Sequence, residues 1–287
     1  MELTPLRLRV VSHALRLLPP GMPGKARAAR LLLGSCLQAQ DVRLRDKYGC
    51  PIVVPSLREP IGFHVLIDGV YEVEPLEFTL SRLQAGSTFV DVGANIGVFA
   101  LPVARKVGSS GCVLAIEPSS NVFPYLKRNI ILNGSSNVRL RQCAAFDSDS
   151  EILRFYEAPI DHFGMGALAA QFHTKPVAVP AQTLDRILDE ERIGRVTLLK
   201  VDVEGFEGAV FRGAKRLLTG DDPPLIVFEF SDWAEARVLG GRVGDAQWVL
   251  RGYGYHIWRL SDFACKRGQP LGDAVVSGYE TLVAVRG

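Results

Sequence analysis

Apolar runs and amphipathic segments alternate along the chain from residue 88 to residue 230. Short runs rich in β-branched and aromatic residues predict buried strands, and segments with apolar residues at a helical spacing predict the helices between them. The predicted strands are residues 88–92, 112–116, 138–144, 198–203 and 225–230. The predicted helices are residues 96–107, 121–133 and 206–218. This alternation is typical of a parallel sheet with helices on both faces.

Two further strands are predicted near the end of the chain, around residues 255–260 and 281–285. No convincing helical pattern lies between them, so we expect them to pair antiparallel at one edge of the sheet. Together with the five earlier strands they make a mostly parallel, seven-stranded sheet. The sequence therefore predicts a Rossmann-like α/β fold over residues 71–287, with a helix over residues 74–83 near its start.

The first 70 residues have a different pattern, which predicts an extension of helices and short strands. Apolar residues from Val10 to Leu18 recur at a helical spacing, and residues 25–33 predict a second helix. From Asp41 to Tyr71, prolines and glycines interrupt β-branched and aromatic residues, which indicates short strands and turns. We expect this extension to cap the larger domain or to contact the substrate.

An insertion at about residues 148–195 interrupts the regular alternation. Within it, residues 152–156 and 177–179 predict a strand pair, and residues 162–166 form a glycine-rich loop. Loops that follow the carboxyl ends of parallel strands form the binding crevice of such sheets. The insertion is therefore a candidate wall of the substrate site.

Composition limits the classes of function that fit the chain. Of its 287 residues, 47% are hydrophobic and 22% are charged, and the net charge of +2 does not point to nucleic acid. The five cysteines stand singly, without the pairs of a zinc site or a redox dithiol. No apolar run matches a signal peptide or a membrane span. We expect a soluble, cytoplasmic protein.

Positive charge is concentrated at the N-terminus, where residues 1–50 hold nine Lys or Arg and three acids. Arg7, Arg9 and Arg16 surround an apolar stripe on the first predicted helix. Such a helix usually exposes a solvated basic face. A weak contact with a membrane surface or with an anionic substrate is the alternative.

The segment FVDVGANIG, residues 89–97, places two glycines at a strand-to-helix turn. Glycine lets the backbone bend sharply there and lets a ligand approach closely. The glycines are spaced GxxxG, whereas the dinucleotide fingerprint is GxGxxG. Asp91, two residues before Gly93, would repel a pyrophosphate but suits the ammonium and sulfonium charges of S-adenosylmethionine (SAM). The segment therefore favours SAM over NAD.

A second acid supports a nucleoside site, because Glu117 ends the next predicted strand, 20 residues after Gly97. At this spacing an acidic residue accepts hydrogen bonds from ribose hydroxyls. Asp147, after the third strand, is either an acceptor for the adenine amine or an ordinary turn residue. The predicted cofactor-binding residues are Asp91, Gly93, Ala94, Asn95, Gly97, Glu117, Pro118, Asp147 and Asp202.

Four segments together resemble the FkbM-type family of SAM-dependent methyltransferases over roughly residues 71–287: DVGANIG, AIEPSSNVFPYLKRNIILNG, QTLDRIL and LLKVDVEGFEGAVFRGA. The last is the most specific, because the family version reads close to KxDxEGxE before a helix. The resemblance implies a class I methyltransferase fold and O-methylation of a hydroxyl on a sugar, glycan, macrolide or similar acceptor.

Two positions depart from what the resemblance and the helical pattern lead us to expect. Phe206 stands where the family often has histidine, which removes a polar group near the strand-to-helix junction. Pro102 falls within the predicted helix after Gly97 and should bend that helix or cost it a backbone hydrogen bond. Neither change touches the acids predicted to bind the cofactor.

Methyl transfer to an alcohol uses a group that accepts the hydroxyl proton. The candidate bases are Asp202, Glu204, His162 and Glu229. The structural alternative is a buried ion pair between Lys200 and Glu204, with the Glu207 carboxylate at a helix N-terminus. A divalent metal held by Asp202, Glu204 and Glu229 would have suitable oxygen ligands, but the spacing does not require it and no metal is predicted.

The favoured hypothesis is an O-methyltransferase that acts on a small-molecule or glycan acceptor and binds no nucleic acid. A catalytically weak SAM-binding domain, acting as a sensor or a partner-binding module, is the first alternative. A nucleotide-dependent oxidoreductase is the second, and it is disfavoured by Asp91 and by the missing GxGxxG.

Overall fold

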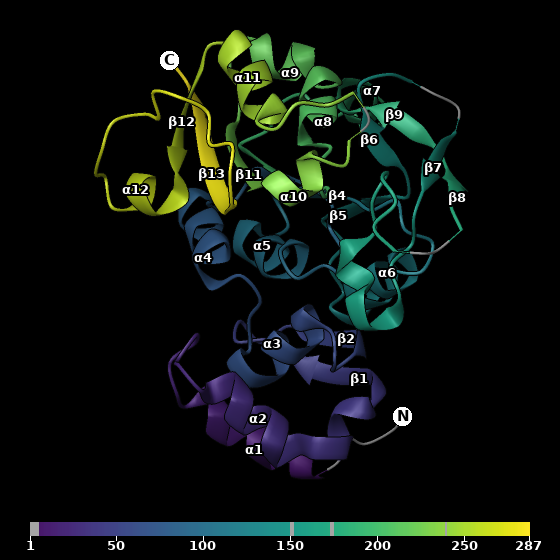
Figure 1. The fold of residues 1–287 in the computed structure, drawn as a ribbon. Coiled ribbons are helices and arrows are strands. Elements are labelled where there is room, and N and C mark those ends of the chain that lie inside the picture. Colours follow the sequence, from purple (N-terminus) through teal and green to yellow (C-terminus); the bar gives the residue numbers. More distant parts are fainter. Residues whose placement is uncertain (1–5, 150–151, 173–174, 239) are drawn as a thin grey trace.

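The computed structural model describes residues 6–149, 152–172, 175–238 and 240–287. Its central feature is a seven-stranded sheet with helices packed on both faces (Figure 1). The strands are β3 Thr88–Val92, β4 Cys112–Ile116, β5 Val138–Arg141, β10 Leu198–Val201, β11 Leu225–Ser231, β12 Tyr255–Arg259 and β13 Tyr279–Arg286. They lie in the order β12-β13-β11-β10-β3-β4-β5.

Strand direction agrees with the sequence prediction. The strands β11, β10, β3, β4 and β5 pair in parallel, and β13 runs antiparallel to both β11 and β12. The predicted Rossmann-like α/β fold with an antiparallel edge is therefore confirmed. In such a sheet the carboxyl ends of the parallel strands open on one side, where ligands bind.

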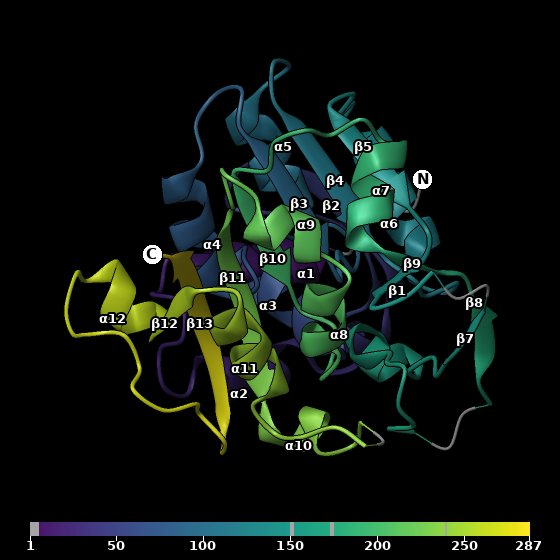
Figure 2. The same cartoon turned by 90° about the horizontal axis from the view of Figure 1, so that it is seen from above.

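Side chains alternate between the two faces of each strand and so build two apolar cores. Phe89 belongs to the first core and its neighbour Val90 to the second. The first core is covered by α4 Val73–Arg82, α5 Ala100–Val107 and α6 Phe123–Leu132. The second is covered by α7 Leu184–Glu190, α8 Glu207–Arg212, α9 Lys215–Thr219 and α11 Asp245–Gly252 (Figure 2).

The helix after the glycine turn begins four residues later than predicted, because residues 96–99 form turns before α5 starts at Ala100. Pro102 therefore lies in the first helical turn. The N–H groups on either side of it donate to carbonyls four residues back, Leu101 to Gly97 at 3.0 Å and Val103 to Phe99 at 3.1 Å, so Pro102 lacks the corresponding bond, as expected.

Two predicted elements are each divided in the structure. The predicted strand 138–144 ends at Arg141, and β6 Ala144–Phe146 leaves the main sheet to pair with β9 Ala181–Thr183. The predicted helix 206–218 breaks at Gly213, where an added Cβ would lie 1.8 Å from the carbonyl oxygen of Phe146. The close approach of β6 explains why this position is glycine.

The segments between strands also differ from the prediction near the C-terminus. A short helix α12 Leu260–Ala264 lies between β12 and β13, where no helix was expected, and α10 Asp232–Glu235 follows β11. In the insertion, β7 Leu153–Phe155 pairs antiparallel with β8 Val177–Val179, as predicted. Most of the predicted glycine-rich loop, residues 162–166, lies within a 3-10 segment, η2 Ile160–Met165. The β7–β8 pair and α12 lie at opposite sides of the molecule (Figures 1 and 2).

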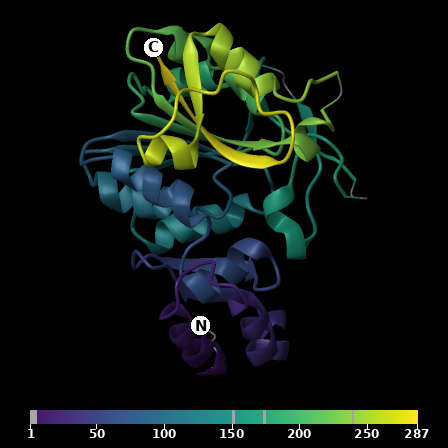
Figure 3. The same cartoon turned by 60° about the vertical axis from the view of Figure 1, so that its left-hand side comes forward.

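Residues 6–68 lie at one end of the molecule, and we call them the N-terminal unit (Figure 3). It contains α1 Leu6–Arg16, α2 Lys25–Leu33, η1 Gly34–Gln38, β1 Gln40–Arg45, β2 Pro51–Ser56 and α3 Pro60–Asp68. In the described part of the chain, no helix has the length and apolar character needed to cross a membrane.

Helix α3 was not predicted, because Pro60 and Gly62 were interpreted as breakers. Pro60 occupies the first turn of α3, where its missing N–H has no helical partner to lose. The carboxylate of Glu59 accepts hydrogen bonds from the N–H groups of Ile61 at 2.7 Å and Gly62 at 3.2 Å. This cap starts the helix.

Asn129 of α6 joins the N-terminal unit to the sheet domain. Its side chain is fully buried, accepts a hydrogen bond from the Val53 N–H at 2.7 Å, and donates to the carbonyls of Val53 at 3.1 Å and Ile96 at 2.9 Å. Apolar residues of the N-terminal unit share the first core with α4, α5 and α6. The domain boundary at residue 70 stays a prediction.

We expect Asn129→Ala to lower the free energy of unfolding by about 2–4 kcal/mol, because it leaves buried backbone groups of Val53 and Ile96 without partners. Urea unfolding measures this change. The matched control is Asn121→Ala, an exposed position just before α6, which we expect to change stability by about 0.5 kcal/mol or less. Equal effects of the two substitutions would contradict the assigned role of Asn129.

Candidate functional site

A cavity lies at the carboxyl ends of β3, β4, β10 and β11. The loops that follow these strands line it, together with residues at the start of α3 and α4 and residues of the insertion. Parallel strands bring residues that are distant in sequence to one side of the sheet. The position of the cavity is the one expected for a ligand site in this fold.

The turn after β3 brings backbone close to the cavity. Gly93 has a φ of 81°, and an added Cβ would lie 1.8 Å from the carbonyl oxygen of Asp202, so only glycine fits. Asn95 has a φ of 49°, and its side chain accepts a hydrogen bond from the Ile96 N–H at 2.8 Å. Gly93, Ala94 and Asn95 line the cavity, whereas Gly97 packs against Leu126 outside the lining.

Glu117 is held beneath this turn. Its side chain is buried, and its two oxygens accept hydrogen bonds from the N–H groups of Asn95 at 3.0 Å and Ser119 at 2.9 Å. Burial raises the pKa of Glu117 to about 7, although both N–H donors act in the opposite direction. Glu117 and Pro118 both line the cavity. A carboxylate has about four acceptor positions, so Glu117 retains capacity for ligand hydroxyls.

Asp91 is a buried acid without a full complement of partners. It is 0% exposed, and within the described ranges neither carboxylate oxygen has a hydrogen-bond partner. The nearest cation is the Lys200 ammonium, with Nζ 3.7 Å from Oδ1 of Asp91. Burial raises the pKa of Asp91 to about 6, and Lys200 partly offsets this effect. A buried acid whose oxygens lack hydrogen-bond partners favours a positively charged ligand.

Lys200 connects Asp91 to the acids at the end of β10. Its Nζ lies 3.0 Å from Oδ2 of Asp202, so Lys200 pairs with Asp91 and Asp202 rather than with Glu204, and the alternative of a buried Lys200–Glu204 pair is wrong. The strand ends at Val201, and Glu204 has a φ of 56°, so the side-chain alternation stops before Glu204. The predicted position of Glu207 is confirmed, since its carboxylate accepts N–H hydrogen bonds at the start of α8.

We use the term acidic end for the part of the cavity formed by Glu72, Asp202, Glu204 and Glu229. Ligand oxygens of Glu72, Asp202 and Glu229 lie within 4.8 Å of one another. The metal ligands considered from the sequence were Asp202, Glu204 and Glu229, so Glu204 stood in the position that Glu72 takes in the structure. Glu72 comes from the start of α4, far from the other acids in sequence, and nothing in its local pattern marks it as a site residue.

The acidic end holds carboxyls that retain protons more strongly than usual. Burial, followed by the charge of Asp202, raises the pKa of Glu72 and of Glu204 to about 7 each. The same two causes raise the pKa of Glu229 well above its ordinary value. Burial would lower the pKa of Lys200, but the surrounding carboxylates outweigh burial and raise it. This end is therefore suited to accept hydrogen bonds and protons near neutral pH.

The insertion forms one wall of the cavity, as expected, with Phe155, Phe163 and Gly164 in the lining. Glu157 fixes this wall to the loop after β4. Its carboxylate accepts hydrogen bonds from the Ser119 hydroxyl at 2.5 Å, and from the N–H and hydroxyl of Ser120 at 2.7 and 2.8 Å. Sequence analysis did not single out Glu157, because its partners lie 37 and 38 residues away.

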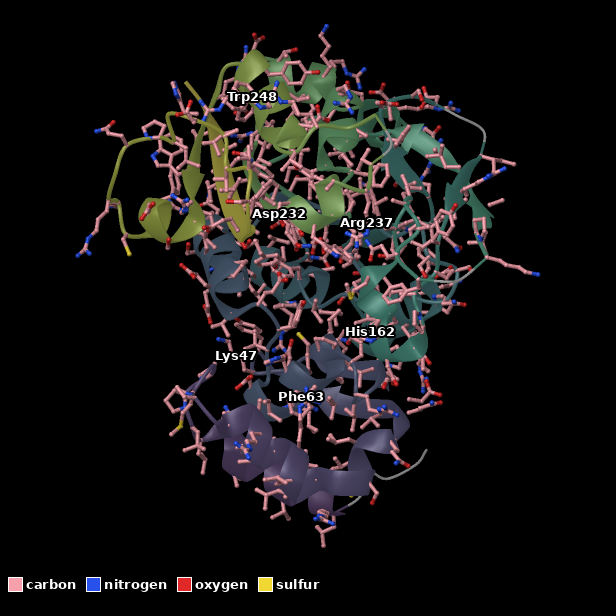
Figure 4. The ribbon with its side chains drawn as sticks, viewed as in Figure 1. Lys47, Phe63, His162, Asp232, Arg237 and Trp248 are labelled. Carbon is pink, nitrogen blue, oxygen red and sulfur yellow. The ribbon has the colours of Figure 1, made fainter. Side chains whose placement is uncertain are left out.

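Besides Gly97, two predicted site residues, His162 and Asp147, lie outside the described cavity lining. His162, labelled in Figure 4, is exposed, and its ring stacks on Phe172 with 5.6 Å between ring centroids. Asp147 is also exposed, with Oδ2 3.7 Å from Nε of Arg212. We therefore leave both out of the proposed machinery. His173, a further loop histidine of the insertion, lies outside the described residues.

The fold and cavity define the class of the protein as a Rossmann-like α/β domain with a ligand site at the carboxyl ends of its parallel strands. The methyltransferase FkbM domain matches residues 91–257, which is more than half of the chain. The chain belongs to this family. The resemblance found from the motifs is thereby confirmed.

Three similar proteins illustrate the relationship. Methyltransferase 1 of Beauveria bassiana is 33% identical over 54% of this chain and 66% of its own length. Methyltransferase sdnD of Sordaria araneosa is 29% identical over 47% of this chain and 63% of its own length, so the chain spans slightly less than two thirds of both relatives. A solved precorrin-6y C5,15-methyltransferase from Geobacter metallireducens aligns with a TM-score of 0.44 and 12% identity, over 75% of this chain and 87% of that one.

The raised pKa values predict how stability depends on pH in the absence of ligand. Glu72, Glu117 and Glu204 have pKa values of about 7 in the folded protein, above the ~4.3 of an unfolded chain. The folded protein therefore binds more protons than the unfolded chain between these values. The free energy of unfolding should fall as pH rises through this window.

We expect Glu72→Gln to reduce the fall in unfolding free energy between pH 5 and pH 8 by about 1–2 kcal/mol, because one titrating group is removed. Urea unfolding at several pH values measures the slope. The control is Glu74→Gln, an exposed position on the same helix, which should leave the slope unchanged. A wild-type stability that rises from pH 5 to pH 8 would contradict the assignment.

Proposed function

We propose that this protein transfers a methyl group from SAM to a hydroxyl of a sugar, a glycan or a secondary metabolite. The observation that carries the proposal is a single cavity that joins the glycine turn and its two buried acids, Asp91 and Glu117, to the acidic end. Membership of the FkbM methyltransferase family supports the type of reaction.

The residues at the glycine turn fit SAM. Gly93 leaves backbone exposed to the cavity at a point where a side chain would clash. Glu117 would accept hydrogen bonds from the ribose hydroxyls. Asp91, buried with two unpartnered oxygens, would lie against the positive charge of the methionine part. A dinucleotide fits less well, because its pyrophosphate would meet the Asp91 carboxylate.

When bound, SAM supplies an electrophilic methyl group on a sulfonium centre. The residues of the chain would hold the acceptor oxygen in line for attack, which supplies much of the rate in such displacements. Lys200 fixes the Asp202 carboxylate through the 3.0 Å contact. Glu204, with a pKa of about 7, is suited to take the hydroxyl proton as the acceptor oxygen attacks.

The lining of the acidic end supports an alcohol acceptor. Carboxylates accept hydrogen bonds from hydroxyl groups, and Asp202, Glu204 and Glu229 all face the same cavity. Phe206 and Trp233 add apolar surface to the same cavity. The combination fits a ligand with both hydroxyl groups and an apolar part, such as a sugar or a polyketide.

We expect Glu204→Gln to lower the turnover number by about 10²–10⁴-fold, the usual contribution of a general base. The wild-type rate should fall as pH drops below about 7, since the base must be ionised, and this limb should be absent in the variant. Transfer of labelled methyl groups to a panel of sugar and polyketide acceptors measures both.

Asp202→Asn should lower turnover more than it lowers SAM affinity, because Asp202 faces the acceptor as well as the cofactor. The exposed substitution Glu74→Gln is the control and should leave turnover unchanged. Suppose that Asp202→Asn and Glu204→Gln both keep wild-type turnover on an acceptor that the wild-type protein methylates. Neither side chain would then have the catalytic role proposed here.

A further inference from the structure

Helix α1 carries apolar side chains on two different faces. Leu8 and Leu15 are buried in the first core. Leu6 and Val10, at a helical spacing of four residues, are 74% and 59% exposed, and Leu17 directly after the helix is 78% exposed. A helix at the surface of a globular protein ordinarily has one apolar stripe, which faces the core. The second apolar face of α1 is therefore unexplained by packing.

The same feature continues into the turn after α1 and into α2. Met22, Leu31 and Leu32 are 45%, 75% and 51% exposed. Seven of the fourteen exposed large hydrophobic side chains among the described residues lie between residues 6 and 32. Single exposed apolar residues are ordinary, but a concentration of this kind marks a surface that binds something. We call this surface the α1–α2 face.

The charge of the α1–α2 face has one sign. Residues 6–40 contain six Lys or Arg and no Asp or Glu. Two of the six are engaged elsewhere, since Arg16 donates to the carbonyls of Val65 and Leu66, and Lys25 pairs with the buried Asp68 at 2.6 Å. Arg30 is exposed but its guanidinium carbon lies 4.5 Å from the centroid of the Phe63 ring, which leaves Arg7, Arg9 and Arg27 as exposed arginines on this face.

We propose that the α1–α2 face binds the surface of a membrane that contains anionic phospholipids. The exposed leucines would enter the boundary between head groups and acyl chains, and the exposed arginines would contact the phosphate groups. Basic side chains at an anionic membrane surface each add to the affinity. Apolar and basic groups side by side, with no acid between them, are the pattern that such a surface requires.

A second copy of the chain is a poorer match for the same face. In a two-fold symmetric contact the same patch lies on both sides, so arginines of one copy would meet arginines of the other. Like charges placed opposite each other at an interface are unfavourable. An anionic membrane surface supplies the opposite charge together with apolar volume.

Membrane binding at this face would also determine where the cavity lies relative to the membrane surface. Helix α1 packs against α3. Glu59, Pro60 and Ile61 at the start of α3 line the cavity. Figures 1 and 3 show α1 and α2 at the end of the molecule farthest from α9 and α11. The inference does not depend on the proposed reaction.

Co-sedimentation of the full chain with lipid vesicles tests the proposal. The probes are vesicles of phosphatidylcholine alone and vesicles of equal parts phosphatidylcholine and phosphatidylglycerol. We expect binding to the mixed vesicles, weaker binding to phosphatidylcholine alone, and a loss of affinity with added salt, because salt screens surface charge.

Three double variants identify the groups responsible. Leu6→Ser with Leu31→Ser should weaken binding to mixed vesicles by about tenfold or more, because two exposed apolar side chains are lost. Arg7→Gln with Arg27→Gln should weaken it by about fivefold or more and remove the preference for anionic lipid. The matched control is Ile131→Ser with Ile152→Ser, which are 69% and 67% exposed on other parts of the surface and should bind as the wild type does.

Absence of wild-type binding to the mixed vesicles would overturn the proposal. So would an equal loss of binding in the isoleucine control. A concentration-dependent dimer that the leucine variant abolishes, seen without any vesicle binding, would assign the face to a second copy instead. Unfolding curves of the variants, expected to match the wild type, exclude a general loss of structure. SAM titration of the same variants separates failure here from failure of the proposed function.

Discussion

The arrangement of the cavity depends on the ion pairs that the Lys200 ammonium group forms with Asp91 and Asp202. Lys200 of β10 lies opposite Asp91 of β3 in the parallel register, with Nζ 3.7 Å from Asp91 and 3.0 Å from Asp202. It is 5% exposed, so its charge is little screened by water. Buried charges are tolerated only when they are paired, and without Lys200 two strand ends would present unbalanced carboxylates to each other. The ion pairs therefore hold the centre of the sheet and the centre of the site together.

One ammonium does not balance all the acids around it. Glu72, Glu204 and Glu229 lie in the same cavity, and burial raises the pKa of each. The free protein meets this excess by retaining protons near neutral pH. A cationic cofactor and an acceptor that donates hydrogen bonds would meet it in another way. The electrostatics of the cavity thus suit a cationic cofactor such as SAM.

Much of the sheet could be predicted from the sequence, because a buried strand is marked by a short run of apolar residues within its own segment. The bounds of β3 and β4 match the predicted strands, and Asp91 and Glu117 lie at their ends as expected. Gly93 lies at a turn after the strand, as expected, whereas its close approach to the carbonyl of Asp202 becomes known only from the fold. Local pattern and tertiary position agree at these residues.

The missed features depend on contacts that residue type and spacing alone do not reveal. Helix α3 begins with a proline that a local pattern marks as a breaker, and a capping carboxylate from Glu59 makes it a start instead. Glu72 joins Asp202 and Glu229 only because the chain folds α4 against the end of the sheet. His162 was placed in the site because of its residue type, whereas the packing of the insertion turns it toward Phe172.

Calorimetric titration of the protein with SAM tests the central claim most directly. We predict that SAM binds with a stoichiometry of one, that NADH does not bind, and that Glu117→Gln weakens SAM binding by about tenfold, since one charge-assisted hydrogen bond to the ligand is lost. Binding of NADH without binding of SAM would contradict the account. SAM binding that Glu117→Gln leaves unchanged would contradict the placement of the cofactor in this cavity.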